Sequence, residues 1–345
     1  MNKSAKYIGL AMCAMMMWSC KNDTNEFPDY EGGVTAYFAY QYPVRTITLG
    51  EDLENDNSLD NDHMCRITAT HSGTYKSRDL RIDIEVDNSL TDNLTFEDGT
   101  PVKAMPSEYY ELSSMTLTKV KDFMFGSYVR LTDAFFADPD ALKNTYVIPV
   151  RMVAAHGADQ ILTGTPLTDG DEPHRCDSEA WSVKPMDYVL YCVKYINPWD
   201  ASYCRRGVDV ITENGNVTKN VRHAQYVEKD EVVGLSTLSL STCSFPVSAK
   251  ITSDGETRTL TCDLTVTFDD DGSCSISTST QGMTASGNGR FVRKGDKNSL
   301  GNKDRDVLYL DYTIDYGVVR YDVNDTLVVR SRDVKLETFS PIYSK

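Results

Sequence analysis

The sequence has few of the residues from which metal sites are built. Its five histidines are scattered, with no HxH or HExxH motif, and no CxxC pair occurs. Because a zinc site needs clustered ligands, we expect no metal and no cofactor. The cysteines after Cys20 are odd in number and are predicted to be small core residues. They are Cys65, Cys176, Cys192, Cys204, Cys243, Cys262 and Cys274.

The apolar run near the start is too short to span a membrane. Residues 8–18 form this run, whereas a bilayer core of about 30 Å needs roughly 20 helical residues. Lys3 and Lys6 precede it and Ser19-Cys20 follows, so residues 1–19 resemble a lipoprotein signal peptide with Cys20 as the lipid-attachment site. Cys13 is the competing position, but it would cut the apolar segment short. A plain signal peptide with a chance cysteine is the alternative.

The segment that follows Cys20 is polar and charged. It resembles the export signal that sends lipoproteins of the Bacteroidota to the outer face of the outer membrane. Residues 20–32 are therefore predicted to be a flexible tether on a protein anchored at the cell surface. Contact with the membrane is expected through the lipid anchor only, since several acyl chains anchor well.

Positive charge is in deficit, with 35 basic against 51 acidic residues and a formal net charge of −16. Loss of Lys3 and Lys6 with the signal peptide would take this to −18. A surface this acidic disfavours nucleic acid and anionic membrane surfaces as partners, and it suits a neutral ligand.

Helical periodicity is scarce, and alternation of apolar and polar residues dominates. Residues 80–86, 146–153, 262–268 and 308–316 each alternate as strands do. Many short strands with turn signals between them indicate sandwiches or barrels. One short helical turn is predicted at residues 138–144, with Asp138 as N-cap and Pro139 at the first helical position.

One hairpin can be predicted to its register. A three-residue loop over residues 270–272 places Gly272 at the left-handed position of a type I turn with a bulge. Phe268 would then face Cys274, and Val266 would face Ile276, so both apolar faces agree. This acidic cluster is therefore predicted to be a turn and not a metal site.

Several segments resemble a lipoprotein family of gut Bacteroidota. They are residues 42–47, 56–61, 101–106, 131–139, 146–149, 197–199 and 205–209. The N-terminal domain of that family is immunoglobulin-like and also precedes the catalytic barrel of some family-18 endoglycosidases. A C-terminal domain resembling a lipocalin barrel follows it in chains of this length, and the genes typically lie among outer-membrane glycan-uptake systems.

The resemblance and the alternation together predict an all-β chain with an N-terminal immunoglobulin-like β-sandwich followed by a C-terminal lipocalin-like antiparallel β-barrel. We assign the sandwich to residues 33–165, a linker to 166–187 and the barrel to 188–345. The stretch 157–187 is rich in Gly, Pro, Asp and Thr, which is typical of a boundary.

No catalytic motif is present. A family-18 hydrolase needs a DxxDxDxE run, and the nearest approximation, residues 79–85, lacks the leading and central acids in register. The chain is also too short for a sandwich and a catalytic barrel of about 250 residues. No GxSxG, P-loop or dinucleotide-binding motif occurs. We therefore predict no catalytic residue and a non-enzymatic protein; an uncharacterised hydrolase is the least favoured reading.

The candidate binding residues are aromatic, because sugars stack their apolar faces on flat rings. Trp181, Trp199, Tyr188 and Tyr203 lie near the expected domain junction, where ligand sites are common. Packing inside the domains is the alternative for both tryptophans. The neighbouring Arg205-Arg206 pair would point to opposite faces of a strand, so it is not expected to form a clamp.

Two further patterns have ordinary explanations. The acidic run 51–62 has a composition like that of a calcium loop, but it lacks glycine at its sixth position and a closing glutamate, so it is predicted to be a solvated loop. Residues 325–327 match the short O-glycosylation sequon used in the Bacteroidota, which is a weak signal.

The sequence thus favours a non-catalytic surface lipoprotein that binds glycan or scaffolds a glycan-uptake complex with other outer-membrane proteins. The alternative is a structural or adhesive protein that contacts another protein or a host surface. The identity of the ligand is not encoded in any motif described above.

Overall fold

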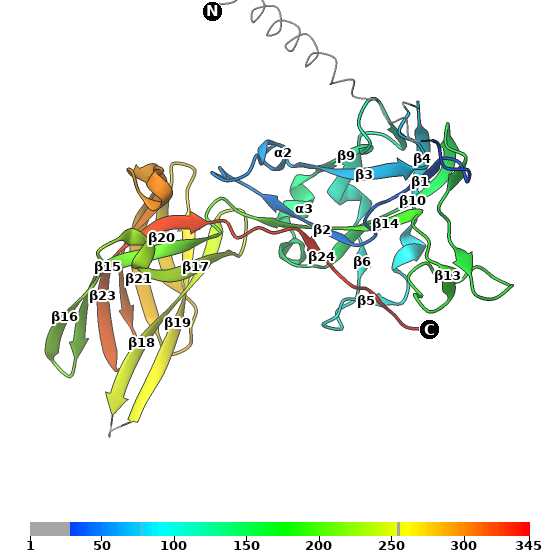
Figure 1. Cartoon of the computed structure of the whole chain (residues 1–345). Helices are drawn as coiled ribbons and strands as arrows, with labels where there is room; N and C mark the ends of the chain where they lie inside the picture. Colours follow the sequence, from blue (N-terminus) through cyan, green and yellow to red (C-terminus); the bar gives the residue numbers. More distant parts are fainter. Residues whose placement is uncertain (1–27, 77, 254–255) are drawn as a thin grey trace, which may run out of the picture.

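The computed structural model describes residues 28–76, 78–253 and 256–345, which form two β bodies joined by short segments (Figure 1). An N-terminal sandwich is followed by a closed antiparallel barrel, so the predicted all-β class with a sandwich and then a barrel is confirmed. Cys20, the predicted signal peptide and most of the predicted tether lie outside the described residues. In the described part of the chain, no helix is long and apolar enough to cross a membrane.

Two sheets build the sandwich. The first has the order β11 (Gln160–Ile161), β1 (Thr35–Tyr37), β3 (Met64–Ser72), β9 (Phe125–Leu131) and β7 (Tyr110–Leu112). The second has the order β24 (Glu337–Thr338), β2 (Pro43–Thr48), β14 (Tyr188–Ile196), β10 (Tyr146–His156), β4 (Arg81–Val86) and β8 (Thr116–Thr118), with β6 (Lys103–Ala104) beside β10. Smaller pairs join β12 (Thr165–Pro166) to β13 (Trp181–Val183) and β5 (Leu94–Thr95) to β25 (Ile342–Tyr343).

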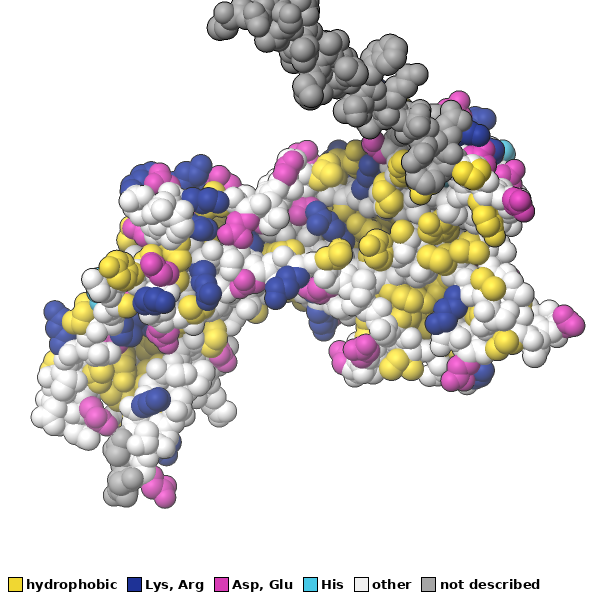
Figure 2. Space-filling model, viewed as in Figure 1, with side chains coloured by type: hydrophobic (Ala, Val, Ile, Leu, Met, Phe, Trp, Pro, Cys, Tyr) yellow, Lys and Arg dark blue, Asp and Glu magenta, His cyan; other side chains and the backbone are white. Residues whose placement is uncertain are grey.

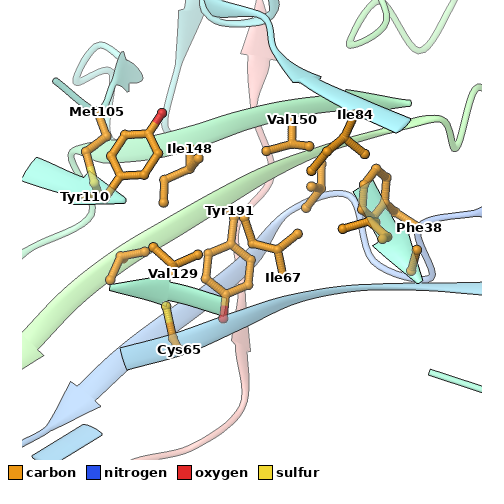
Figure 3. Packing of buried hydrophobic residues seen from close by; sticks show 14 of the residues in the cluster. Phe38, Cys65, Ile67, Ile84, Met105, Tyr110, Val129, Ile148, Val150 and Tyr191 are labelled. Carbon is orange, nitrogen blue, oxygen red and sulfur yellow. The ribbon is translucent and has the colours of Figure 1, made fainter. Parts of the chain in front are cut away.

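The sandwich core fills the space between these sheets. Ile67 and Val129 of the first sheet lie near Tyr191 of the second, and Ile148 and Val150 extend the same layer (Figure 3). Because alternate residues of each strand face inward, the alternation in the sequence predicts this layer directly. Burial of its apolar surface is the main source of stability for this body.

Eight strands close the barrel. They run in the order β15 (Ala201–Glu213), β17 (Glu231–Thr237), β18 (Thr242–Ser253), β19 (Glu256–Phe268), β20 (Ser273–Thr278), β21 (Thr284–Asp296), β22 (Arg305–Asp315) and β23 (Val319–Ser331), and β23 pairs with β15. A ninth strand, β16 (Asn216–Arg222), pairs with the second half of β15. Gly287 and Gly289 face the barrel interior, where a Cβ atom would lie 2.4 Å from the Cβ of Tyr312 or 2.5 Å from the side chain of Leu310.

The helices are short. They are α2 (Ser58–Asn61), α3 (Asp133–Ala137) and the 3₁₀ turns η1 (Asn88–Thr91), η2 (Ser107–Tyr109), η3 (Pro139–Leu142), η4 (Val227–Lys229) and η5 (Leu300–Asn302). The predicted turn at residues 138–144 is η3, with Asp138 accepting a hydrogen bond from the Asp140 amide and Pro139 at its start. The predicted hairpin is also confirmed, since Phe268 pairs with Cys274, Val266 pairs with Ile276, and Gly272 has φ +82°.

The predicted boundary between the domains was wrong in three places. Residues 188–196 form β14, which pairs with β10 and β2 inside the sandwich and not within the barrel. The predicted linker 166–187 packs on the sandwich through Cys176 and Trp181. Residues after β23 return to the sandwich as β24 and β25. An apolar strand buried on both faces suits the middle of either domain, so its sequence pattern does not identify its neighbours.

The true junction is a single turn, residues 197–200, together with the returning chain at Arg332. The Asn197 side chain donates to the carbonyls of Ser239 and Thr242 and accepts from the amides of Trp199 and Asp200. The guanidinium of Arg332 donates to three backbone carbonyls, those of Leu49 at 3.0 Å, Asn197 at 2.7 Å and Asp200 at 2.7 Å. Both chain crossings are therefore held by hydrogen bonds to buried backbone.

All seven described cysteines are buried and unpaired, which confirms their prediction as core residues. Burial raises the pKa of several of these thiols, those of Cys65 and Cys192 to about 12. A thiol with so high a pKa carries almost no thiolate at neutral pH, so these side chains act as packing groups.

Candidate ligand-binding site

The aromatic residues predicted near the junction do not form an exposed site. Trp181 is buried, and its indole nitrogen donates to the carbonyl of His174 at 3.1 Å. Tyr188 is also buried, with its hydroxyl bonded to that of Tyr42 and to the carbonyl of Arg175 at 3.3 Å. Both rings pack the segment that had been predicted to be a linker against the sandwich. The expectation that they are exposed was wrong: Tyr188 packs in a cluster with Cys176 and Leu190, and Trp181 is buried and bonded within its own segment.

The other two candidates belong to the barrel core. Trp199 stacks on Phe268 with ring centroids 4.0 Å apart and planes inclined by 3°. Tyr203 is fully buried, and its hydroxyl donates to the carbonyl of Trp199 at 2.7 Å. These contacts correspond to the packing alternative for Trp199 and contradict exposure of Tyr203. Phe268 thus covers one face of the half-buried Trp199 indole, and Tyr203 has no exposed face.

The paired arginines do point to opposite faces of β15, as the strand alternation predicted. Arg205 faces the barrel interior and contacts Asp325, whereas Arg206 contacts Asp230 outside it. Asp325 and Leu327 of the O-glycosylation pattern are buried in the barrel. The role of Asp325 in the interior accounts for the acid in that pattern without a glycan.

The acidic run 51–62 is not simply a solvated loop. It contains α2, and Asp60 at its end is buried, paired with Arg45 and hydrogen-bonded to the amide of Thr48 at 3.0 Å. Asp60 therefore ties the run to β2, which corrects the prediction for this residue. The described residues contain no group of three or more His, Cys, Asp or Glu arranged to hold a metal ion.

An exposed aromatic cleft lies elsewhere, at one end of the sandwich. Its volume is about 720 Å³, and we define the aromatic cleft by Tyr30, His71, Tyr75 and Phe123. Tyr30, Tyr75 and Phe123 are 70%, 76% and 51% exposed, unusual values for such large rings. Three loops supply these rings: the segment before β1, the loop after β3 and the loop before β9.

Backbone contacts hold the three loops together. The Tyr30 amide donates to the carbonyl of Gly73 at 2.8 Å, and the Thr70 hydroxyl donates to the carbonyl of Phe123 at 3.1 Å. Gly73 has φ +92°, and a Cβ atom there would lie 2.2 Å from the carbonyl oxygen of Gly33. Only glycine allows the first two loops to approach this closely.

His71 forms the polar floor of the aromatic cleft. Its side chain continues the inward row of Cys65, Ile67 and Ala69 on β3 and is only 5% exposed. The centroid of its ring lies 5.4 Å from that of Phe123, and no side chain of the described residues bonds to either ring nitrogen; the polar group beside the ring is the Ser72 backbone. Burial and the charge of Lys119 lower the pKa of His71 below its ordinary value of 6.5, so the imidazole is neutral at pH 7.

The rim of the aromatic cleft is polar. Asp29 accepts hydrogen bonds from the Thr74 hydroxyl at 2.6 Å and from the Lys76 ammonium at 3.1 Å. The Lys119 ammonium lies 5.9 Å from the centroid of the Phe123 ring. Flat apolar surfaces flanked by a few fixed polar groups are the usual composition of a small-molecule site.

Sequence reasoning missed the aromatic cleft because its residues are far apart in the chain. One signal was present: in the alternating run 64–72, a histidine occupies a position where cysteine, isoleucine and alanine precede it on the inward face. A histidine in a core row needs hydrogen-bond partners, so its neighbourhood merits inspection. No comparable pattern marks Tyr30, Tyr75 or Phe123.

Comparison with known proteins supports a two-part organisation. A family model described as an N-terminal domain matches residues 29–159, and one described as Domain of unknown function (DUF5627) matches residues 198–333. A search of curated proteins finds no match. The crystal structure of a protein of unknown function from Bacteroides ovatus is 41% identical, with a TM-score of 0.85 over 92% of this chain and 100% of that chain.

Two other solved structures are far less similar. An auxiliary nutrient binding protein from Bacteroides thetaiotaomicron is 12% identical, with a TM-score of 0.35 over 85% of this chain and 95% of that chain. A proposed carbohydrate binding protein from Bacteroides ovatus is 12% identical, with a TM-score of 0.26 over 70% of this chain and 66% of that chain. Such low TM-scores do not indicate a shared arrangement, so these proteins carry no argument about this chain.

Proposed function

The chain belongs to the family of the Bacteroides ovatus protein of unknown function, and its own C-terminal domain matches DUF5627. From that premise we propose that the chain is a surface lipoprotein that binds glycan without cleaving it. The aromatic cleft is the binding site in this proposal. The observation that carries it is the presence of three exposed rings around one cleft, above a buried histidine to whose ring no side chain of the described residues bonds.

The chemistry of sugars explains why such a cleft suits them. A sugar exchanges hydrogen bonds to water for hydrogen bonds to protein, so polar contacts alone add little net affinity. Stacking on Phe123, Tyr75 or Tyr30 buries the apolar face of the sugar ring, at low entropic cost because the aromatic side chains have few rotamers. Hydroxyl groups of the sugar then bond to Asp29, Glu31 or the His71 ring, which line the cleft.

The position of the aromatic cleft relative to the proposed anchor fits capture near the membrane. Pro28 lines the cleft, and it follows the proposed lipid-attachment residue Cys20 by eight positions. A fully extended chain of that length spans at most about 29 Å. A ligand in the cleft would thus lie close to the outer membrane, where an uptake complex could accept it.

A protein-contact role is the alternative, and one observation favours it. Val120 is 77% exposed and Met124 is 39% exposed, on the same loop as Phe123. On the face drawn in Figure 2, hydrophobic side chains are also grouped over the sandwich. Contiguous exposed apolar surface commonly marks an interface between proteins. The aromatic cleft differs from a flat interface in its concave shape and its polar floor.

Glycan-array screening of the chain from residue 20 onward, followed by calorimetric titration of the glycans retained, tests the proposal. Phe123→Ala and Tyr75→Ala should each weaken binding at least tenfold, or about 1.4 kcal/mol. Melting temperatures should stay within about 2 °C of the parent, because both rings are largely exposed. Tyr40→Ala is the matched control, since Tyr40 is 61% exposed outside the aromatic cleft.

Two outcomes would contradict the proposed site. If the array retains no glycan, the protein-contact alternative becomes the better one. If a glycan binds and both variants bind it as the parent does, the site lies elsewhere on the chain.

Lipidation at Cys20 is tested separately. Cys20→Ala should abolish palmitate labelling and release the protein from the membrane fraction, because no acyl chain would remain to anchor it. Substituting Cys13, the other cysteine of this segment, should leave both properties unchanged. Retained labelling in Cys20→Ala would refute the assignment.

A further inference from the structure

The barrel interior is divided into an apolar part and a polar part. Phe245, Leu264 and Leu310 belong to the apolar part, as expected for a barrel filled by its own side chains. In the polar part, two arginines and two aspartates contact one another. They are Arg205 and Asp209 from β15, Arg222 from β16 and Asp325 from β23. A barrel that needed only stability would be expected to fill this space with apolar side chains.

The four charged groups form one connected network. Arg222 donates to Asp209 from Nε at 2.9 Å and to Asp325 from Nη2 at 2.6 Å. Arg205 donates to Asp325 from Nε at 3.0 Å and to the Tyr312 hydroxyl at 3.1 Å. Tyr312 in turn donates to Asp325 at 2.7 Å. These contacts fix β16 against β15 and β23, which is a sufficient structural reason for the paired groups.

Other groups at the same place are not accounted for by that structural role. In the described part of the chain, Nη1 of Arg222 is buried without a hydrogen-bond partner. Nη1 of Arg205 has only a 3.6 Å ion pair with Glu231, whose side chain is 55% exposed. Tyr316 and Tyr321 line the same space, and no hydrogen bond to either hydroxyl occurs among the described residues.

This space is a small cavity with an opening through the barrel wall. Its volume is about 180 Å³, close to the roughly 150 Å³ that accommodates one benzene ring. β17 pairs with β18 only at Ser236 and Thr237, near the junction with the sandwich. Beyond that pairing the two strands separate, and Glu231 of β17 and Ser248 of β18 both border the cavity there. We define the barrel mouth by Arg205, Arg222, Glu231, Ser248 and Tyr321.

We propose that the barrel mouth is a second binding site, for a neutral polyhydroxylated molecule the size of one sugar ring. The charges select against an anion, because Arg205 and Arg222 are offset by Asp209 and Asp325, and Glu231 adds a further negative charge. Ile211, Val247 and Ile314 supply apolar walls. Hydroxyl oxygens of the ligand accept from Nη1 of Arg222, and from Nη1 of Arg205 beside its long contact with Glu231, and bond to the hydroxyls of Tyr316 and Tyr321.

The volume sets how the ligand enters. One ring fills the cavity, so a longer saccharide can insert only a terminal residue, whereas a free monosaccharide enters whole. The barrel mouth therefore differs from the aromatic cleft, whose exposed rings and larger volume suit the side of a chain. The second site does not depend on the first, since their residues belong to different domains.

Saturation-transfer NMR and calorimetric titration test the proposal with the full chain from residue 20 onward. The probes are glucose, galactose, mannose, N-acetylglucosamine and fucose, each at up to 10 mM, and the corresponding disaccharides. We expect at least one to bind saturably. Tyr321→Phe, which removes one hydroxyl, and Ile211→Phe, which adds bulk to an apolar wall of the cavity, should each weaken binding at least tenfold.

Matched controls separate this site from general effects. Tyr309→Phe removes a hydroxyl from the outer face of the same barrel, and Val221→Phe adds comparable bulk at an exposed position of β16. Phe123→Ala in the aromatic cleft should also leave binding at the barrel mouth unchanged. Equal loss in Tyr321→Phe and Tyr309→Phe would overturn the proposal, as would binding that Ile211→Phe leaves within twofold. Failure of every probe to bind would overturn it too, whatever the glycan array gives for the aromatic cleft.

Discussion

His71 differs from every other inward residue of β3. Cys65, Ile67 and Ala69 on the same face are apolar, whereas His71 has two ring nitrogens to which no side chain of the described residues bonds. A buried polar atom without a partner typically costs about 1–3 kcal/mol. The sandwich would gain stability from an apolar residue here, so His71 is the residue of the proposed site whose substitution tells most about its cost to the fold.

The neutral state of His71 predicts a pH dependence of stability. Burial, Lys119 and Arg78 all lower its pKa in the folded chain, while the unfolded value stays near 6.5. As the pH falls below about 6.5, the unfolded chain binds a proton that the folded chain does not, so stability falls until the folded pKa is passed. Thermal melts between pH 7.5 and 5.5 should show a smaller loss of melting temperature in His71→Gln than in the parent.

The other titratable groups around His71 set the control for that measurement. Lys119 and Arg78 are the basic groups that act on the imidazole, and Asp29, whose pKa is lowered by Thr74 and Lys76, stays ionised over this range. His174 also has a pKa lowered by burial, on a different segment, so His174→Gln reports the general contribution of a buried histidine. If His71→Gln and the parent lose the same melting temperature, the imidazole is not held neutral by the fold.

At the scale of elements, local patterns predicted structure well where both partners are close in sequence. The hairpin of β19 and β20 was predicted to its register because a three-residue loop and two apolar faces leave one solution. The η3 turn followed from Asp138 and Pro139 for similar local reasons. Neither prediction required knowledge of distant neighbours.

β14 illustrates the opposite case. Its residues are buried on both faces, which fits a central strand of either domain. In the structure it pairs in parallel with β2, some 140 residues earlier in the chain, and antiparallel with β10. Pairing over such distances depends on how whole sheets assemble, and no local pattern records it.

At the scale of the whole molecule, the junction links the two bodies by two chain crossings. β14 leads through residues 197–200 into the barrel, and the chain after β23 returns past Arg332 to pair with β2 and β5 (Figure 1). Both the first and the last strand of the barrel, β15 and β23, are therefore connected by the chain to the sandwich. A protease that cuts one crossing would leave the other intact.

Arg332 is predicted to couple the unfolding of the two bodies. Arg332→Ala leaves three backbone carbonyls without their charged donor, which should cost about 2–4 kcal/mol. Differential scanning calorimetry should give one transition for the parent and a lowered, broadened or split transition for the variant. The exposed neighbour Arg330 provides the matched variant Arg330→Ala, which should behave as the parent. An unchanged single transition in Arg332→Ala would mean that other contacts hold the junction.

Composition and alternation by themselves determined the all-β class, the hairpin register and the burial of the cysteines. The order of sandwich and barrel followed from the sequence through a family resemblance. These properties depend on neighbours a few residues apart or on which face of a strand is apolar. Tertiary structure alone decided that Trp181, Tyr188 and Tyr203 are core residues while Tyr30, Tyr75 and Phe123 surround a cleft. An aromatic ring has the same local signature in both settings, and its exposure depends on loops that meet only after the sheets have formed.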